Sequence, residues 1–244
     1  MVITSLDNDK VKKYRKLQKR KYRDEYGEYI VEGLHLILEA YKAGVLEELI
    51  LEEGLEVPVP CPCNYFSKEV MSKISMMDNP STIMGLCRKL TKNEVVGNKI
   101  LILDEIQDPG NLGTIIRSAV AFNIDTIVLS ENTVDLYNPK VLRATQGMFF
   151  HVNIVSCIAR EVIALLNNLE IPVYGTSVLN GVDARTLDDF EKEKFALIVG
   201  NEGNGVRNSI LDMCDKNLYI PMNSNVESLN VAIAASILLY ELGR

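Results

Sequence analysis

Residues 100–117 read ILILDEIQDPGNLGTIIR, and this stretch determines the fold expected for the larger part of the chain. Its first four residues, 100–103, are all apolar and predict a buried β-strand. The sequence DPGN at residues 108–111 is typical of a turn. Apolar residues at helical spacing then predict a helix over residues 112–122, with Asn111 as its candidate N-cap. A buried strand that leads directly into a helix begins a parallel α/β unit.

The same alternation of strands and helices continues to the end of the chain. Apolar runs predict further strands over residues 126–129, 152–155, 172–176, 195–199 and 218–220. Helical spacing predicts helices over residues 139–143, 159–168, 206–213 and 228–242. This order indicates an α/β domain with a mostly parallel sheet covered on both faces. Ligands of such domains usually bind beyond the carboxyl ends of the strands.

The first part of the chain predicts a smaller α/β unit. Helices are expected over residues 8–25, 34–43 and 67–76, and strands over residues 29–32, 48–51 and 82–86. The polar segment 91–99, which contains Gly97, is expected to be a linker. We therefore predict two domains, residues 1–95 and residues 96–244.

Charge is distributed unevenly along the chain. The formal net charge is −7, yet residues 10–23 hold nine basic residues and no acidic one, so the other 230 residues carry a net charge of −16. Such a basic helix is either a solvated surface or an element that contacts phosphates of a nucleic acid. Tyr14 and Tyr22 lie within it and either stack on bases or pack on the core. The candidate RNA-binding residues are Lys12, Lys13, Arg15, Lys16, Lys19, Arg20 and Arg23.

Composition also limits the kinds of site and compartment. No apolar run approaches the roughly 20 residues that cross a bilayer, and the N-terminus lacks the layout of a signal peptide, so we expect a cytoplasmic protein without membrane contact. Five cysteines without regular spacing argue against a disulfide framework. The pair Cys61 and Cys63 has neither His35 nor His151 at ligand spacing, so we expect no metal site.

Two further polar segments follow predicted strands. Residues 199–206 read VGNEGNGV, and three glycines in six residues allow a close approach of backbone to a ligand, although a plain turn is the alternative. Their order is not the G-x-G-x-x-G of dinucleotide-binding folds, which disfavours an NAD-dependent enzyme. Residues 220–236 read IPMNSNVESLNVAIAAS, a polar loop before an apolar helix that Ser228 or Asn230 could cap.

Together the three segments resemble the signature motifs of the SpoU/TrmH RNA methyltransferases. The resemblance rests on N-x-G-x-x-x-R from Asn111, LIVGNEGNGV from Leu197 and IPM followed by ESLNVAIA from Ile220, in matching order and spacing. It covers residues of about 100 to 244. The segment before Leu90, with its basic helix and YIVEG at residues 29–33, resembles the small substrate-binding domain of ribosomal-RNA members.

The resemblance implies a specific fold, cofactor and assembly. It implies a deep trefoil knot near the C-terminus, a homodimer formed through the C-terminal domain, and S-adenosylmethionine as the cofactor. Backbone of Gly200, Ile220 and Leu229 is then expected to contact the cofactor, with Met222 nearby and Thr176 and Ser177 at the border. The family's polar active-site positions match Asn111, Arg117, Glu202, Ser228 and Asn230.

The implied activity is methyl transfer from S-adenosylmethionine to a ribose 2′-hydroxyl of RNA, with ribosomal RNA of the 23S type favoured over transfer RNA. Because the pKa of arginine lies above 12, we expect Arg117 to act as a charge that binds phosphate and stabilises developing alkoxide rather than as a base. Asn111 and Glu202 would orient Arg117 or the ribose. A non-catalytic RNA-binding protein of ribosome assembly is the alternative, which the intact N-x-G-x-x-x-R and ESLN segments disfavour.

Overall fold

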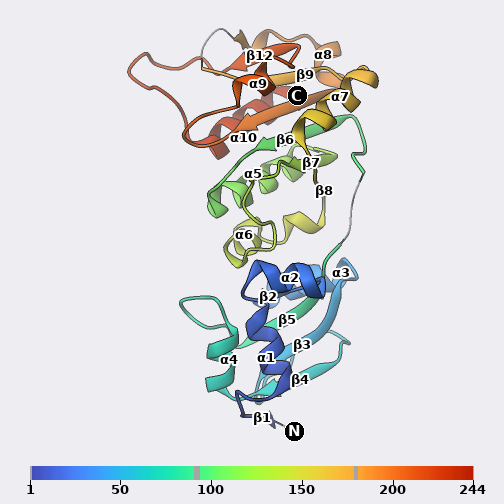
Figure 1. Cartoon of the computed structure of the whole chain (residues 1–244), viewed down its shortest axis with the longest axis vertical. Coiled ribbons are helices and arrows are strands. Elements are labelled where there is room, and N and C mark those ends of the chain that lie inside the picture. The colour runs from blue at the N-terminus through green and yellow to red at the C-terminus, as the bar shows by residue number, and fades with distance from the viewer. Residues whose placement is uncertain (1, 91–93, 179–180, 244) are drawn as a thin grey trace. The chain divides into compact units, whose positions relative to one another are not determined.

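The computed structural model describes residues 2–90, 94–178 and 181–243. The chain forms two compact units, one of Met1–Thr91 with Asp135–Phe150 and one of Lys92–Val134 with His151–Arg244 (Figure 1). The predicted division after residue 95 did not foresee that residues 135–150 belong with the first unit. The predicted linker 91–99 begins outside the described residues, and Lys99 is already the first residue of a strand.

The second unit contains a seven-stranded sheet in which every pair of neighbours is parallel. The strand order is β10-β12-β9-β11-β6-β7-β8. The six strands predicted from apolar runs are confirmed, and the short β10 was not predicted. The strands are β6 (Lys99–Asp104), β7 (Thr126–Leu129), β8 (Asn153–Ser156), β9 (Val173–Thr176), β10 (Val182–Asp183), β11 (Phe195–Gly200) and β12 (Lys216–Tyr219).

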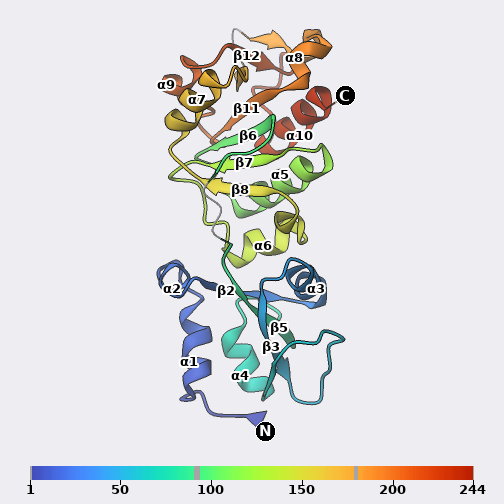
Figure 2. The same ribbon diagram turned by 90° about the vertical axis from the view of Figure 1, so that its right-hand side faces the viewer.

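Helices cover both faces of this sheet, as Figure 2 shows. One face carries α5 (Pro109–Ala121) and α10 (Val231–Leu242), and the other carries α7 (Ala159–Asn168) and α9 (Asn208–Leu211). Alternate strand residues face opposite sides: Ile100 and Ile102 of β6 belong to the core formed with α7. The remaining elements are α8 (Asp189–Glu193) and the 3₁₀ turn Ala184–Thr186.

The direction of winding reverses within the sheet. From β6 the chain adds β7 and β8 on one side, whereas β9, β11 and β12 all lie on the other side. Such a switch point brings the carboxyl ends of neighbouring strands together beside a crevice that suits a ligand. Here it brings together the ends of β6, β9, β11 and β12. The trefoil knot stays a prediction.

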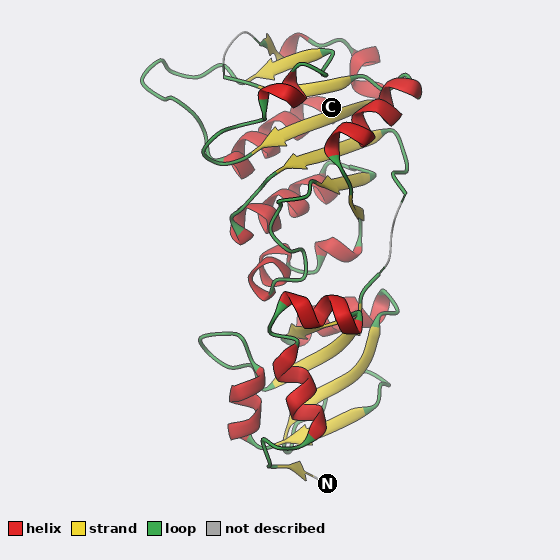
Figure 3. Cartoon of the chain, in the orientation of Figure 1, coloured by secondary structure: helices red, strands yellow, loops and turns green. Residues whose placement is uncertain are grey.

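The first unit contains a five-stranded mixed sheet of order β1-β4-β3-β5-β2. Val11 and Tyr14 of α1 and Val70 of α4 belong to one core cluster with Ile50 of β3 and Phe66 of β4. Figure 3 shows the helices and strands of this unit by colour. The elements are β1 (Val2–Ile3), α1 (Asp9–Lys16), α2 (Arg20–Tyr26), β2 (Glu28–Glu32), α3 (Leu34–Lys42), β3 (Leu46–Glu52), β4 (Cys63–Phe66), α4 (Lys68–Ile74), β5 (Ile83–Arg88), α6 (Pro139–Thr145) and the 3₁₀ turn Met148–Phe150.

The predicted helix 8–25 is interrupted, so its continuity was wrong. α1 ends at Lys16 and α2 begins at Arg20. The break turns the carbonyls of Leu17 and Gln18 toward Arg23, whose Nη1 donates to both at 2.8 and 3.0 Å. A buried guanidinium needs such acceptors, so the break and the burial of Arg23 stabilise one another.

The described residues contain neither a membrane-spanning helix nor a cluster of metal ligands. No helix within residues 2–90, 94–178 and 181–243 is long and apolar enough to span a membrane. The same residues contain no group of three or more His, Cys, Asp or Glu side chains arranged to hold a metal ion.

Candidate active site

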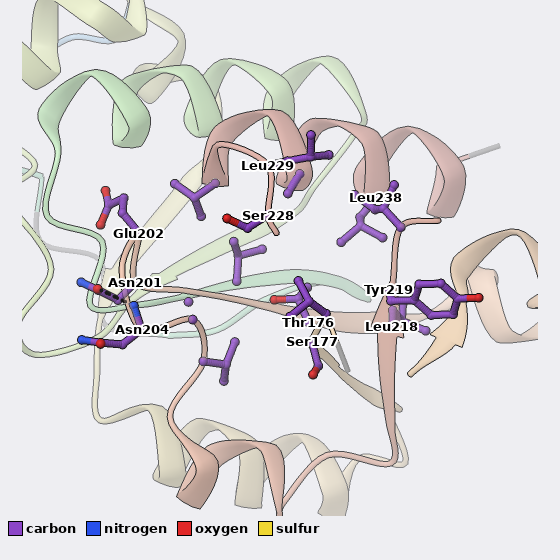
Figure 4. A pocket seen from close by; sticks show the side chains of 18 of the residues that line it. Thr176, Ser177, Asn201, Glu202, Asn204, Leu218, Tyr219, Ser228, Leu229 and Leu238 are labelled. Carbon is purple, nitrogen blue, oxygen red and sulfur yellow. Dashed lines mark hydrogen bonds between the residues drawn. The ribbon is translucent and has the colours of Figure 1, made fainter. Parts of the chain in front are cut away.

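A cavity of about 360 Å³ lies at the carboxyl ends of β9, β11 and β12, with the start of α10 as one wall (Figure 4). This is the size and the place expected for a small-molecule site in a parallel α/β fold. The cavity is lined by all six residues predicted to contact a cofactor and by two of the predicted polar residues. These are Thr176, Ser177, Gly200, Ile220, Met222 and Leu229, together with Glu202 and Ser228.

The glycine-rich segment forms a closed loop at this cavity. Asn201 and Gly205 exchange backbone hydrogen bonds of 3.0 and 2.9 Å. The side-chain Oδ1 of Asn201 accepts from the backbone N–H groups of Gly203 and Asn204. A Cβ atom on Gly200 would lie 2.1 Å from the carbonyl carbon of Gly205. Residue 200 must therefore be glycine for the loop to close, which is the physical reason for this part of the motif.

Three predicted polar residues form one hydrogen-bonded group beside the loop. Asn111 Nδ2 donates to Glu202 Oε1 at 3.1 Å, and Asn230 Nδ2 donates to Asn111 Oδ1 at 3.0 Å. Asn111 lies in α5, Glu202 in the glycine loop and Asn230 at the start of α10. Glu202 and Asn230 follow Asn111 by 91 and 119 residues in the sequence. The tertiary fold therefore assembles one polar centre from the three motifs.

Glu202 is held as a carboxylate. Its oxygens accept backbone N–H groups of Gln107 and Asp108, the latter at 2.9 Å. Burial alone would raise the pKa of Glu202, but the hydrogen bonds from Asp108 and Asn111 outweigh it, so the pKa lies below its ordinary value. A carboxylate with a lowered pKa accepts a proton poorly near neutral pH. Glu202 is therefore suited to orient groups and to attract positive charge.

The expected N-cap of α5 was wrong by one turn. Asp108 is the N-cap, its side chain accepts the N–H of Asn111 at 2.8 Å, and Pro109 is the first helical residue. Proline suits this position because its missing N–H needs no partner there. Asn111 thus lies inside the helix, and its side chain is available for the contacts with Glu202 and Asn230. Asn230 does cap α10, as predicted, through Ala232 and Ile233.

Arg117 is separated from this group. It lies on α5 six residues after Asn111, which corresponds to a rotation of about 240° around the helix. Its side chain is exposed and is not part of the cavity lining. Within the described part of the chain, the Arg117 side chain forms no hydrogen bond and no ion pair. A contact by which Asn111 or Glu202 orients Arg117 is absent from the same set of residues.

An ion pair between Asp104 and Arg207, which the sequence did not reveal, holds the glycine loop against the end of β6. The carboxylate of Asp104, at the end of β6, is fully buried. Arg207 follows the loop and donates to the Asp104 carboxylate from Nε at 3.1 Å and from Nη2 at 2.6 Å. The signal that could have found Asp104 is an acid that directly follows an apolar run and ends its strand, because a buried carboxylate needs a partner.

The predicted RNA-binding cations of the first unit lie in different environments. Arg15, Lys16 and Lys19 are exposed. The side chains of Lys12, Lys13 and Arg20 are in part accessible and pair with the acids Asp7, Glu28 and Asp24.

Arg23 corrects the prediction. Its side chain is 5% exposed and forms an ion pair of 2.6 Å with Asp135, so it does not present its guanidinium to RNA. Tyr14 is also buried and packs edge-on against Phe66. Tyr14 therefore serves the core, whereas Tyr22 is only partly covered.

Comparison with family models agrees with both units. Residues 98–240 match the SpoU rRNA Methylase family, and residues 8–85 match the MRM3-like substrate binding domain. The chain belongs to the SpoU rRNA methylase family. The matched range 98–240 of this SpoU family member includes the cavity lining, the glycine loop and Arg117.

Relatives match this SpoU family member over nearly its whole length. The 23S rRNA (guanosine(2553)-2′-O)-methyltransferase RlmP of Bacillus subtilis is 38% identical over 98% of each chain. The crystal structure of an AdoMet-bound rRNA methyltransferase from Sinorhizobium meliloti has a TM-score of 0.87 at 29% identity, with 99% and 97% of the chains covered. A TrmH-family structure from Porphyromonas gingivalis has the same TM-score at 31% identity, with 98% of each chain covered.

Proposed function

We propose that this protein transfers a methyl group from S-adenosylmethionine to a ribose 2′-hydroxyl of ribosomal RNA of the 23S type. The observation that carries the proposal is the hydrogen-bonded group Asn111–Glu202–Asn230, of which Glu202 lines the cavity together with the glycine loop. The name of the Bacillus subtilis relative supports both the reaction and the RNA. We propose the cytoplasm as its place of action, in keeping with a bacterial relative that acts on ribosomal RNA.

The cavity fits S-adenosylmethionine. Its lining combines backbone of the glycine loop with apolar side chains such as Met222, Leu229 and Leu238. Exposed backbone N–H and C=O groups suit a nucleoside, and apolar walls suit its base. The tight closure at Gly200 leaves backbone, rather than a side chain, at the cavity surface. When bound, the cofactor would supply an electrophilic methyl group on a cationic sulfonium, and Glu202, which lines the cavity, would offer a carboxylate of complementary charge.

The polar residues then have separate tasks. The hydrogen bond between Asn111 and Glu202 restricts the rotation of both side chains. Held in this way, the two side chains orient the ribose. Arg117 binds a phosphate of the RNA and stabilises negative charge on the attacking oxygen. Glu202 is a poor base because its pKa is lowered. The proton of the hydroxyl therefore leaves to phosphate or water.

A homodimer is part of the proposal. The side chains of Ile233, Ile237 and Tyr240 are 53%, 36% and 49% exposed, at spacings of four and three residues on α10. An apolar stripe of this kind suits burial against a second copy. Arg117 does not line the cavity of its own chain. In a dimer, it could act at the cavity of the second copy. Gel filtration with light scattering tests this point, and a monomer at working concentration would contradict it.

The basic residues of α1 and α2 support RNA binding by the first unit. Surface ion pairs such as Lys12–Asp7 stabilise little and yield readily to phosphates. We propose that Lys12, Lys13, Arg15, Lys16, Lys19 and Arg20 contact the RNA backbone. Arg23 is not among them because its side chain is buried against Asp135.

The test is transfer of labelled methyl from S-adenosylmethionine to unmodified ribosomal RNA and to transfer RNA, with Arg117→Ala in parallel. We expect label in a ribose of 23S RNA and a loss of at least about 100-fold in the variant. Cofactor affinity should be unchanged, because Arg117 is assigned to the RNA phosphate rather than to the cofactor. Label in transfer RNA alone would show that transfer RNA, and not ribosomal RNA, is the substrate. Cofactor binding without transfer to either RNA would point to another substrate, such as an assembly intermediate. Neither transfer nor cofactor binding would favour a non-catalytic RNA-binding protein.

A further inference from the structure

Two tyrosines of α2 form a small aromatic surface flanked by lysines. The rings of Tyr22 and Tyr26 are stacked, with centroids 6.1 Å apart and planes at 29°. Lys16 Nζ lies 5.5 Å and Lys21 Nζ 5.8 Å from the centroid of the Tyr22 ring. We call these four residues the tyrosine platform. All of them belong to the first unit, so the platform does not depend on how the units are placed.

The ammonium groups of the platform are available to an anion. Lys16 and Lys21 are exposed, and neither forms an ion pair with a carboxylate in the described part of the chain. Lys10 and Lys13 on the same α1–α2 segment differ, because they pair with Glu48 and Glu28 at 2.8 and 2.7 Å. Lys16 instead donates to the Tyr26 hydroxyl at 3.4 Å. The platform therefore keeps positive charge beside an aromatic face.

The neighbouring acids do not cancel this charge. Asp24 is held by Lys89 at 2.5 Å and lies 3.6 Å from Arg20. The hydrogen bond from Lys89 lowers the pKa of Asp24, against the raising effect of its burial, so it stays an ion within that pair. Glu25 is the other acid of α2, and it is exposed and free to turn to solvent.

We propose that the tyrosine platform binds unpaired nucleotides of the RNA substrate, with a base stacked on Tyr22 and phosphates at Lys16 and Lys21. The inference rests on the proposed function, in that it specifies the RNA that the first unit takes. An aromatic face can stack only on a base whose own face is open, and in a duplex the neighbouring pairs cover it. Stacking with flanking cations is the common mode of binding to single strands and tolerates any sequence.

Tyr22 is the residue on which the proposal depends. Tyr26 is partly buried and packs against the core, so it supports the ring above it. Tyr22 is outside that core cluster, and its ring carries the two cation contacts. Its role is thus separable from the stability of the unit, whereas Tyr14 on the preceding helix is fully buried.

The experiment measures binding of the full-length protein to a short fluorescein-labelled oligouridylate and to a blunt-ended RNA duplex with the same number of phosphates. We expect Tyr22→Leu to weaken oligouridylate binding about tenfold and duplex binding less than about twofold, whereas Tyr22→Phe keeps both. Tyr41→Leu is the matched control, because Tyr41 is a 44% exposed tyrosine on α3 of the same unit. It should change neither affinity.

A second variant does not touch the rings. Lys16→Gln combined with Lys21→Gln should lower the slope of log affinity against log salt for oligouridylate by about 1.4, which corresponds to two phosphates. Glu25→Gln should strengthen binding. Circular dichroism melts establish that each variant is folded. Unchanged oligouridylate binding in Tyr22→Leu, or an equal loss on the duplex, would overturn the platform.

Methyl transfer keeps this outcome distinct from failure of the proposed function. If the wild type methylates ribosomal RNA and Tyr22→Leu binds the oligouridylate normally, only the platform is refuted. If the wild type shows neither methyl transfer nor binding of S-adenosylmethionine, the proposed function fails, while the oligonucleotide measurement still decides whether unpaired RNA binds at Tyr22.

Discussion

The guanidinium of Arg207 forms a two-point contact with the buried carboxylate of Asp104, with Nη2 2.6 Å from Oδ1 and Nε 3.1 Å from Oδ2. The backbone N–H of Arg207 donates to the same carboxylate at 3.3 Å. Strand β11 pairs with β6 so that Gly200 lies beside Asp104. The contact thus joins both ends of the glycine loop to the end of β6, and it fixes the loop that lines the cavity.

Asp104→Ala should destabilise the protein and weaken binding of S-adenosylmethionine. The change leaves Arg207 with only the Glu105 carboxylate, 3.3 Å from its Nη1. Because the Arg207 side chain is 39% exposed, we expect a loss of about 2–3 kcal/mol, below the roughly 3–5 kcal/mol of a fully buried pair. Urea denaturation and calorimetry measure the two effects. Arg185→Ala is the control, since Arg185 forms a similar two-point contact with Asp183 in solvent, and its denaturation midpoint should not move. Equal midpoints for both variants would contradict the anchoring role.

Gly200→Ala should abolish cofactor binding. The added Cβ would lie 2.1 Å from both the carbonyl carbon of Gly205 and the backbone nitrogen of Val206, neither of which can move without opening the loop. The free energy of unfolding should fall, as thermal melting can show. Gly203→Ala is the matched change for stability, because its Cβ would meet only the Asn201 side chain at 3.6 Å. A folded Gly200→Ala variant with normal cofactor affinity would refute this reading of the motif.

The lowered pKa of Glu202 should appear in the pH dependence of stability. Its carboxylate contributes stability above the ordinary value of 4.5, and the contribution is lost as the pH falls through the lower folded-state pKa. Glu202→Gln should therefore lower the free energy of unfolding near neutral pH and show a smaller decrease on acidification. Denaturant titrations at several pH values measure this. If the two proteins have parallel pH profiles, the hydrogen bonds from Asp108 and Asn111 do not stabilise the ion.

Substitution of Arg23 should affect stability, whereas substitution of Arg15 should affect RNA binding. Arg23→Ala leaves the Asp135 carboxylate without its buried partner, and we expect a loss of about 3–5 kcal/mol in stability. Arg15→Ala should leave stability unchanged, because Arg15 is exposed, and should lower the salt dependence of RNA binding by about one phosphate contact. Chemical denaturation and fluorescence anisotropy provide the readouts. A stable Arg23→Ala variant with weakened RNA binding would restore the original prediction for Arg23.

Local sequence determined most of the secondary structure and the order of the polar motifs. Apolar runs predicted all six long strands of the parallel sheet, and helical spacing predicted α7 with its observed bounds. Both signals depend on residues a few positions apart, which is why they can be read from the chain alone. The strands β1, β4 and β10 were missed because two of them contain two residues each and β4 is only partly buried.

The tertiary structure decided how those residues are used. Asn111 suits a helix cap by its chemistry, but Asp108 and Pro109 fix the helix start, and Asn111 instead joins Glu202 and Asn230. Arg23 suits RNA by its charge, but the break after α1 turns it inward to Asp135, which is 112 residues away in sequence. Asp104 and Arg207 pair across 103 residues. Contacts at such separations are set by strand order and packing, which no local periodicity encodes, so the sequence determined the parts and the fold determined their partners.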